Sequence, residues 1–199
     1  MAANRSVLIT AVGRELEGGD IEALAGEKNL KVVNLSDQER ELSAIVSADL
    51  LADGDSLIVG IGEYTFDAEV ATALGVPVLL LTATGAAESP AAELALARVE
   101  ELGAQATGVD KLDASALDAA LSTDARQVMS PAVFENWLIT RAKEKRAHIV
   151  LPEGEDDRIL EAAHQLLKQD VADLTILGVS DDIERRADDL GLNLEGANI

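Results

Sequence analysis

The chain has 199 residues, of which 48% are hydrophobic and 27% charged, and it contains no cysteine. This composition excludes an intrinsically disordered tail and a small disulfide-stabilised domain, and it indicates a soluble globular protein. There are 16 Lys and Arg residues against 37 Asp and Glu residues, which gives a net charge of −21. A field of this sign repels nucleic-acid phosphates and anionic lipid surfaces, so we expect neither nucleic acid nor a membrane as a partner.

No stretch of the sequence has the length of an apolar targeting or membrane-spanning segment. The first apolar run, residues 7–12, is too short for the core of a signal peptide. No later window approaches the roughly 18 to 20 apolar residues that a membrane-spanning helix needs. We therefore expect a cytoplasmic protein.

Short apolar runs alternate with amphipathic stretches through the first 112 residues. We predict β-strands over residues 7–12, 31–35, 56–61, 77–82 and 105–112. The intervening stretches predict helices over residues 37–51, 66–74 and 89–102. Strands that alternate with helices in this way indicate an α/β domain with three layers and a parallel sheet.

Local signals mark the ends of these helices. Ser36 and Glu39 have the spacing of a capping box at the start of the first helix. Gly75 ends the second helix, and Ser89 followed by Pro90 opens the third. We expect these residues to set the helix boundaries.

The composition changes after residue 112, and we place a domain boundary near Ala125. Residues 113–127 carry no strand pattern and allow one more short helix. Residues 1–125 hold 7 basic and 22 acidic groups, a net charge of −15, whereas residues 126–199 hold 9 and 15, a net charge of −6. The sequence thus predicts two domains, 1–125 and 126–199.

The second part contains fewer elements than a complete α/β domain. A helix begins at Ser130-Pro131, strands are predicted over 148–151 and 174–177, and two more helices follow these strands. Two strands and three helices cannot close a doubly wound sheet. We expect residues 126–199 to be the beginning of a larger domain, with open strand edges that a neighbouring chain can cover in a homo-oligomer.

The first strand is followed by a loop with the glycine spacing of a phosphate-binding P-loop. Gly13 and Gly18 keep that spacing, but Gly19 and Asp20 replace the lysine and the hydroxyl residue that bind phosphate and magnesium. Glu15 and Glu17 add negative charge to the loop. We therefore expect no ATP binding here; an ordinary turn and a degenerate P-loop both remain open.

Other residues favour structural interpretations. Gly60-Ile61-Gly62 lacks the third glycine of a dinucleotide fingerprint, so we interpret it as a strand-to-loop turn. His148 and His164 have no metal-binding spacing, and we expect no metal site. Phe134, Trp137 and Leu138 share one helix face, which predicts a place in a core or in a seam between the two parts.

Residues 134–199 contain several motifs in a distinctive order: a helix with a basic end, Leu151-Pro152-Glu153, Asp157-Arg158, Val171-Ala172-Asp173 and Gly178. In this order they resemble the start of the catalytic domain of phosphate acetyltransferases. The resemblance implies an enzyme that transfers acetyl between coenzyme A and phosphate, with acetyl-CoA and phosphate as substrates and without a metal or an organic redox cofactor. It also implies that the catalytic residues lie beyond Ile199, so the catalytic residues stay unknown and we expect this chain alone to be inactive.

Residues 1–125 are similar, more weakly, to the extra N-terminal domain of long phosphate acetyltransferases, which is related to dethiobiotin synthetase-like P-loop folds. The supporting segments are residues 57–60, residues 68–78 and residues 102–109. The resemblance implies a regulatory or assembly domain without a functional P-loop. A non-enzymatic α/β module that senses a ligand or joins subunits is the alternative for the chain.

Within residues 126–199, we assign Glu153 and Arg158 as substrate-binding residues. They follow a predicted parallel strand, and open α/β sheets bind ligands at the carboxyl ends of their strands. Arg158 is the expected contact to phosphate or coenzyme A. The alternative is ordinary scaffolding, in which Arg158 pairs with a neighbouring carboxylate.

Overall fold

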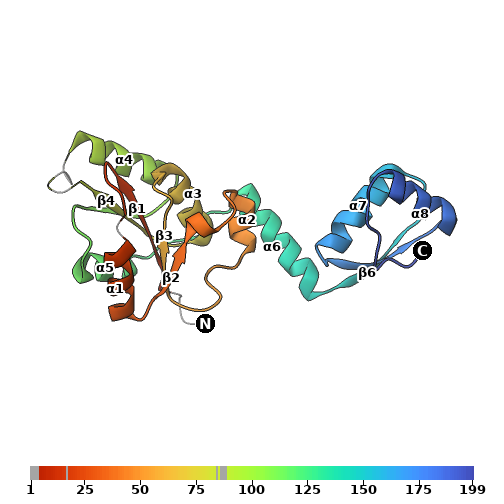
Figure 1. The fold of residues 1–199 in the computed structure, drawn as a ribbon, viewed down its shortest axis with the longest axis horizontal. Coiled ribbons are helices and arrows are strands. Elements are labelled where there is room, and N and C mark those ends of the chain that lie inside the picture. Colours follow the sequence, from red (N-terminus) through yellow and green to blue (C-terminus); the bar gives the residue numbers. More distant parts are fainter. Residues whose placement is uncertain (1–4, 17, 84, 86–88) are drawn as a thin grey trace. The chain divides into compact units, whose positions relative to one another are not determined.

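The structure is a computed structural model, and it describes residues 5–16, 18–83, 85 and 89–199. The chain forms two compact units, Met1–Phe134 and Glu135–Ile199 (Figure 1). Among the described residues, no helix is both long enough and apolar enough to cross a membrane.

The first unit is built on a parallel sheet of five strands. The strands are β1 (Val7–Val12), β2 (Lys31–Asn34), β3 (Ser56–Val59), β4 (Val78–Thr82) and β5 (Ala106–Val109). Their order in the sheet is β2-β3-β1-β4-β5, and every neighbouring pair is parallel. Because β1 pairs on both sides, its apolar residues lie at the centre of the sheet. The predicted parallel α/β fold is confirmed.

Helices cover both faces of this sheet, as three layers require. The helices α1 (Gly18–Lys28) and α5 (Ala114–Leu121) pack on one face, against inward-pointing strand residues such as Ile9 and Leu57. On the other face, residues such as Leu8 pack against α2 (Leu42–Ser47), α3 (Tyr64–Leu74) and α4 (Pro90–Glu101). Figure 1 shows α1 and α5 together on one side of the sheet.

The helix boundaries are confirmed in two places and wrong in one. Gly75 ends α3 with a left-handed φ of 72°, and the Ser89 hydroxyl caps α4 by accepting the N–H of Ala92. The predicted capping box at Ser36 does not start a helix. Residues Leu35–Asp37 form a short 3-10 turn that buries Leu35, and α2 begins only at Leu42. Burial of Leu35 at the end of β2 takes priority over the local capping signal.

The segment after α5 belongs with the first unit. The side chain of Gln127 donates a hydrogen bond to the carbonyl of Ala73 at 2.7 Å, and the N–H of Val128 donates to the carbonyl of Thr72 at 2.9 Å. Both bonds satisfy carbonyls in the last turn of α3. Val133, in the first turn of α6 (Pro131–Glu144), is buried with Val46. The division between the units therefore falls at residue 134, nine residues after the predicted boundary at 125.

The second unit contains a parallel β-α-β arrangement. Its strands β6 (Ala147–Leu151) and β7 (Ala172–Ile176) are paired in parallel, and α7 (Asp157–Lys168) connects them. The helix α8 (Ser180–Asp189) follows β7 and shares a core with α7 and β7. Asn198 adds a short parallel bridge on the other side of β7, at Thr175.

The face of α6 that carries Phe134, Trp137 and Leu138 is exposed. These side chains are 50%, 45% and 52% exposed, so they do not lie in the core of either unit. Of the residues in α6, Val133 is the buried one. A place of this face in a seam between the two parts stays a prediction.

Candidate functional site

The turn that follows β3 is closed by a buried carboxylate. Asp67, in α3, is fully buried, and its two oxygens accept the N–H groups of Ile61 at 2.9 Å and Gly62 at 3.2 Å. The hydroxyl of Thr10 in β1 donates to the same carboxylate at 2.5 Å. Successive backbone amides in a turn can bind an external anion. Here they bind a carboxylate of the chain itself, as suits the structural turn that the sequence suggested.

Gly60 gives this carboxylate its space. A Cβ at position 60 would lie 2.6 Å from Cγ of Asp67, which is too close for any side chain. Burial raises the pKa of Asp67, and the hydrogen bonds from Thr10, Ile61 and Gly62 partly oppose this rise. Glu63 adds electrostatic repulsion that also raises the pKa. The hydrogen bonds to this carboxyl group thus come from one hydroxyl and two backbone amides.

The turn after β1 has the predicted glycine, and its cation, Arg14, is hydrogen-bonded to the backbone of another loop. Gly13 adopts a left-handed φ of 72°, and α1 begins at Gly18. The guanidinium of Arg14 donates to the backbone carbonyl of Asp110, beyond the end of β5, at 3.2 Å. Glu17 lies outside the described residues. The absence of ATP binding at this loop stays a prediction.

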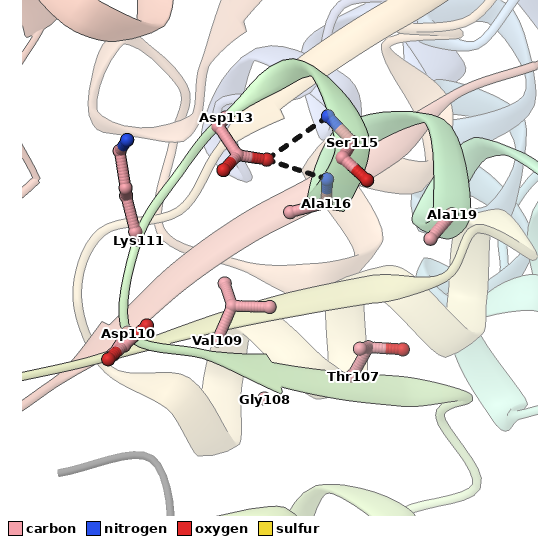
Figure 2. A pocket seen from close by; sticks show the side chains of 9 residues that line it. All are labelled: Thr107, Gly108, Val109, Asp110, Lys111, Asp113, Ser115, Ala116 and Ala119. Atoms are coloured by element: carbon pink, nitrogen blue, oxygen red, sulfur yellow. Dashed lines mark hydrogen bonds between the residues drawn. The ribbon is translucent and has the colours of Figure 1, made fainter. Parts of the chain in front are cut away.

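An open cavity of about 520 Å³ lies beside β5 and the start of α5 (Figure 2). Asp113 caps α5, because one of its carboxylate oxygens accepts the N–H groups of Ser115 and Ala116 at 3.1 and 3.0 Å (Figure 2). Lys111 is the cation among the lining residues, beside Asp113 and Asp110. Two carboxylates and one ammonium group do not form a site for an anionic substrate.

The second cavity lies where β6 and β7 end. It measures about 750 Å³ and is lined by Pro152, Glu153, Gly154, Glu155, Asp156, Arg158, Leu177 and Gly178. The turn of residues 152–154 approaches the end of β7 closely, and the N–H of Gly154 donates to the carbonyl of Leu177 at 3.2 Å. A Cβ on Gly154 would lie 2.7 Å from that carbonyl oxygen. Glycine at 154 therefore lets the two strand ends meet.

Arg158 lies at the rim of this cavity and is paired with Asp156. Its Nε and Nη2 atoms donate to the two carboxylate oxygens of Asp156 at 3.1 and 2.6 Å. Asp156 also caps α7 by accepting the backbone N–H of Arg158 at 2.9 Å. The guanidinium and this N–H lower the pKa of Asp156 to about 2. The Arg158 side chain is 86% exposed, so the pair is open to solvent.

Both residues predicted to bind substrate line this one cavity. Glu153 is exposed at its edge, and Arg158 faces it from the first turn of α7. The pairing of Arg158 with Asp156 matches the scaffolding alternative, yet it also fixes the guanidinium beside the cavity. A role of Glu153 and Arg158 in substrate binding stays a prediction.

Two carboxylates have defined roles in these turns, and Asp67 is the one that the sequence did not single out. Asp67 lies within an apolar helix stripe next to Ala68 and Ala71, and a charged residue in such a stripe signals a buried partner. Asp156 stands directly before the predicted helix, which is the usual place of a capping residue. Both signals are readable in the sequence, but the partner Thr10 is 57 residues away from Asp67.

The two histidines have hydrogen-bond partners within the second unit. The Nε2 atom of His148 lies 2.7 Å from the hydroxyl oxygen of Thr175, and Nδ1 of His164 lies 2.9 Å from the carbonyl oxygen of Asn193. In the part of the chain that the structure describes, no group of three or more His, Cys, Asp or Glu side chains is placed to hold a metal ion.

Comparisons with known proteins bear on the second unit. Residues 133–199 match the model of the phosphate acetyl/butaryl transferase family. A phosphate acetyltransferase of Corynebacterium glutamicum is 61% identical over 69 residues, which are 35% of this chain and 21% of that protein. Phosphate acetyltransferases of Nitratidesulfovibrio vulgaris and Helicobacter pylori are 41% identical over 88 residues and 39% identical over 89 residues.

These matches cover a limited part of each protein. They comprise 44% and 45% of this chain for the second and third relatives, and 12% and 17% of those relatives. The chain thus spans about a fifth or less of the length of the three relatives it matches. No solved structure matches the chain. The resemblance to phosphate acetyltransferases is confirmed for residues 133–199.

Proposed function

We propose that this chain is part of a phosphate acetyltransferase, which moves an acetyl group from acetyl-CoA to phosphate and gives acetyl phosphate and coenzyme A. The observation that carries the proposal is the 61% identity over 69 residues to an enzyme of that name. The cavity at the carboxyl ends of β6 and β7 supports it, because open α/β sheets bind their ligands at that edge.

In this proposal Arg158 contacts an anionic substrate group, either phosphate or a phosphate of coenzyme A. A guanidinium has five N–H donors, and Asp156 accepts two of them, so donors remain for a ligand. Asp156 holds the guanidinium in a fixed orientation through two parallel hydrogen bonds. Glu153, at the same edge, shapes the entrance and limits which anions approach.

The first unit acts in this proposal as a regulatory or assembly domain. In its 60–62 turn, the N–H groups of Ile61 and Gly62 donate to Asp67 and that of Gly60 donates to the carbonyl of Ile9. Its 13–20 loop lacks the lysine and hydroxyl residues of a working P-loop. Calorimetry with ATP and magnesium should detect no micromolar binding to the chain. Binding that disappears when Arg14 or Gly13 is altered would contradict this part of the proposal.

We also propose a cytoplasmic homo-oligomer with small-molecule substrates and without a metal or an organic redox cofactor. The net charge of −21 supports the exclusion of nucleic acid and anionic membranes as partners. Acetate metabolism is the corresponding setting, since acetyl phosphate and acetyl-CoA are interconverted in it.

A chimera tests the proposed activity without relying on this chain alone. Residues 133–199, which match the family, replace the corresponding segment of the Corynebacterium glutamicum phosphate acetyltransferase, and acetyl-CoA formation from acetyl phosphate and coenzyme A is measured. We expect an active chimera, whereas the 199-residue chain by itself is expected to be inactive. A folded but inactive chimera would overturn the proposal.

The same chimera tests the role of Arg158. Arg158→Ala should raise the KM for phosphate or coenzyme A about tenfold, the effect of losing about 1.4 kcal/mol of substrate binding, with little change in kcat. Arg185→Ala is the matched control, because Arg185 pairs with Asp182 in α8. Equal kinetics for both variants would leave Arg158 with a scaffolding role only.

A further inference from the structure

Two ion pairs meet at the first turn of α7, which carries Arg158 to the rim of the cavity beside β6 and β7. In the first pair, Asp156 accepts from the Arg158 guanidinium at 2.6 Å. In the second pair, Nε and Nη2 of Arg186 in α8 donate to the two carboxylate oxygens of Asp157, both at 2.6 Å. Two parallel hydrogen bonds of this kind fix the geometry of the pair as well as balancing its charges. Arg186 thus ties α8 to the first turn of α7.

The helix α8 also supports this cavity at a second place. Ile183, about one turn before Arg186, is buried and lies against Gly154 and Gly178, which line the cavity. A Cβ on Gly154 would lie 2.6 Å from Cδ1 of Ile183, and a Cβ on Gly178 would lie 2.8 Å from it. Residues three positions apart lie on the same face of a helix. One face of α8 therefore contacts both the 152–154 turn and, through Arg186, the first turn of α7.

The order Asp156-Asp157-Arg158 links the two ion pairs through the backbone. Asp156 accepts the backbone N–H of Arg158 at 2.9 Å as the cap of α7. Asp157 stands between this cap and Arg158, so a contact that fixes Asp157 also fixes the backbone from which the Arg158 side chain extends. The hydrogen bonds from Arg186 lower the pKa of Asp157, while partial burial and the charge of Asp156 oppose this change. Asp157 is therefore ionised at neutral pH and able to hold Arg186.

We propose that Arg186 is a positioning residue for substrate binding, which holds the first turn of α7 through Asp157 and thereby holds the Arg158 guanidinium at the edge of the cavity. This inference rests on the proposed function, in which Arg158 contacts an anionic group of the substrate. The side chains of Arg186 and Asp157 are 49% and 39% exposed, so their pair adds little to the stability of the unit. Its effect should be seen in the placement of Arg158.

Hydrogen exchange of the 199-residue chain tests the positioning without any need for activity. In the first turn of α7, the N–H groups of Ile159 and Leu160 both donate to the carbonyl of Asp156. Arg186→Ala should make these two amides exchange about threefold faster, because the turn opens more often. Arg185→Ala is the matched control, since Arg185 is the neighbouring residue and pairs with Asp182 within α8 itself. Equal exchange rates in the two variants would overturn the inference.

Kinetics of the chimera that carries residues 133–199 test the consequence for substrate binding. Arg186→Ala should raise the KM for phosphate or coenzyme A about threefold with little change in kcat, and Arg185→Ala should change neither. Arg186→Lys keeps the charge but loses the two parallel hydrogen bonds, so its KM should lie between those of the parent and Arg186→Ala. A KM for Arg186→Ala equal to that of Arg185→Ala would contradict the positioning role.

A double-mutant cycle shows whether Arg186 acts through Arg158. In an Arg158→Ala background, Arg186→Ala should raise the KM no further, because the group that it positions is already gone. A threefold rise in both backgrounds would assign Arg186 an independent effect of its charge on the substrate and would overturn the inference. A folded but inactive chimera would overturn the proposed function and this inference with it, whereas an active chimera without the expected KM change would overturn this inference alone.

Discussion

The two units contain the same local design, a parallel strand followed by a short turn and a helix, but the turns differ in what their donors bind. In the 60–62 turn, the N–H groups of Ile61 and Gly62 donate to the buried carboxylate of Asp67. In the 152–154 turn, the neighbouring carboxylate is Asp156 at the helix cap, where it holds an exposed guanidinium.

We call the 60–62 turn closed, because the N–H groups of Ile61 and Gly62 bind Asp67 of the chain itself. We call the 152–154 turn open, because a cavity of about 750 Å³ lies beside it. Asp67 comes from within its helix, whereas Asp156 precedes its helix and is one of the residues that line the cavity. The local fold alone does not make a binding site. What matters is whether the hydrogen-bond donors at the strand ends are bonded within the chain or available to a ligand.

The largest expected effect comes from filling the space that the closed turn needs. Gly60→Ala should lower the free energy of unfolding of the first unit by about 3 kcal/mol, because its Cβ overlaps the Asp67 carboxylate. Gly62→Ala is the control: it has a φ of 85° and no atom within 4 Å of its Cβ, so it should cost about 1 kcal/mol. Chemical denaturation measures both. Equal losses would mean that the turn adapts to a side chain.

Removal of the carboxylate itself should have the next largest effect. Asp67→Ala leaves the Thr10 hydroxyl and two amides without their acceptor, and we expect a loss of about 2 kcal/mol in unfolding free energy. Glu69→Ala, at an exposed position of the same helix, should change stability by less than about 0.5 kcal/mol. Added formate should partly restore the stability of the Asp67→Ala variant by binding the freed amides. No difference between the two variants would contradict the closed-turn interpretation.

The two carboxylates should respond to pH in opposite ways. Burial raises the pKa of Asp67 above 3.8, so its contribution favours the folded state at low pH and is lost as the pH rises through the raised value. The pKa of Asp156 is lowered to about 2, so its contribution is present above pH 3.8 and is lost as the pH falls towards 2.

Carboxyl-carbon chemical shifts, followed by NMR between pH 2 and 7, would measure both titrations. Asp67→Asn and Asp156→Asn identify the two signals. A lower pKa for Asp67 than for Asp156 would contradict the expected difference between the closed and the open turn.

The smallest effect is expected at the open turn. Asp156→Ala removes the cap of α7 and should increase hydrogen exchange in its first turn. Arg158→Ala leaves that cap in place and removes only an exposed ion pair, so exchange in α7 should stay nearly unchanged. An effect of Arg158→Ala as large as that of Asp156→Ala would assign Arg158 a mainly structural role.

Most of the sheet could be predicted because most of its strands are short apolar runs, which are typical of buried β-strands. The bounds of β1, Val7–Val12, are those expected from hydropathy alone. The start of α2 could not be predicted, since the capping pattern of Ser36 and Glu39 competes with burial of Leu35, which only the packed sheet reveals. Local pattern is reliable where it agrees with packing and fails where the two conflict.

The site was predictable to a different degree in each unit. Glu153 and Arg158 could be placed at a strand end because their distance in sequence from β6 is short. The Thr10 to Asp67 contact spans 57 residues and depends on which strand lies beside which. The exposure of Trp137 could likewise not be predicted, since helical spacing of apolar residues is the same on a buried and on an exposed face.

Positions 60 and 67 compete for one volume, and this constrains the order in which mutations can be inherited. A lineage that acquires a side chain at Gly60 before Asp67 is shortened passes through a strained protein. The reverse order passes through a protein whose Ile61 and Gly62 amides are free to bind a solute anion. The second route loses less unfolding free energy, and its intermediate has two backbone amides available to bind an anion. Descendants should therefore keep glycine at 60 with an acid at 67, or replace the acid first.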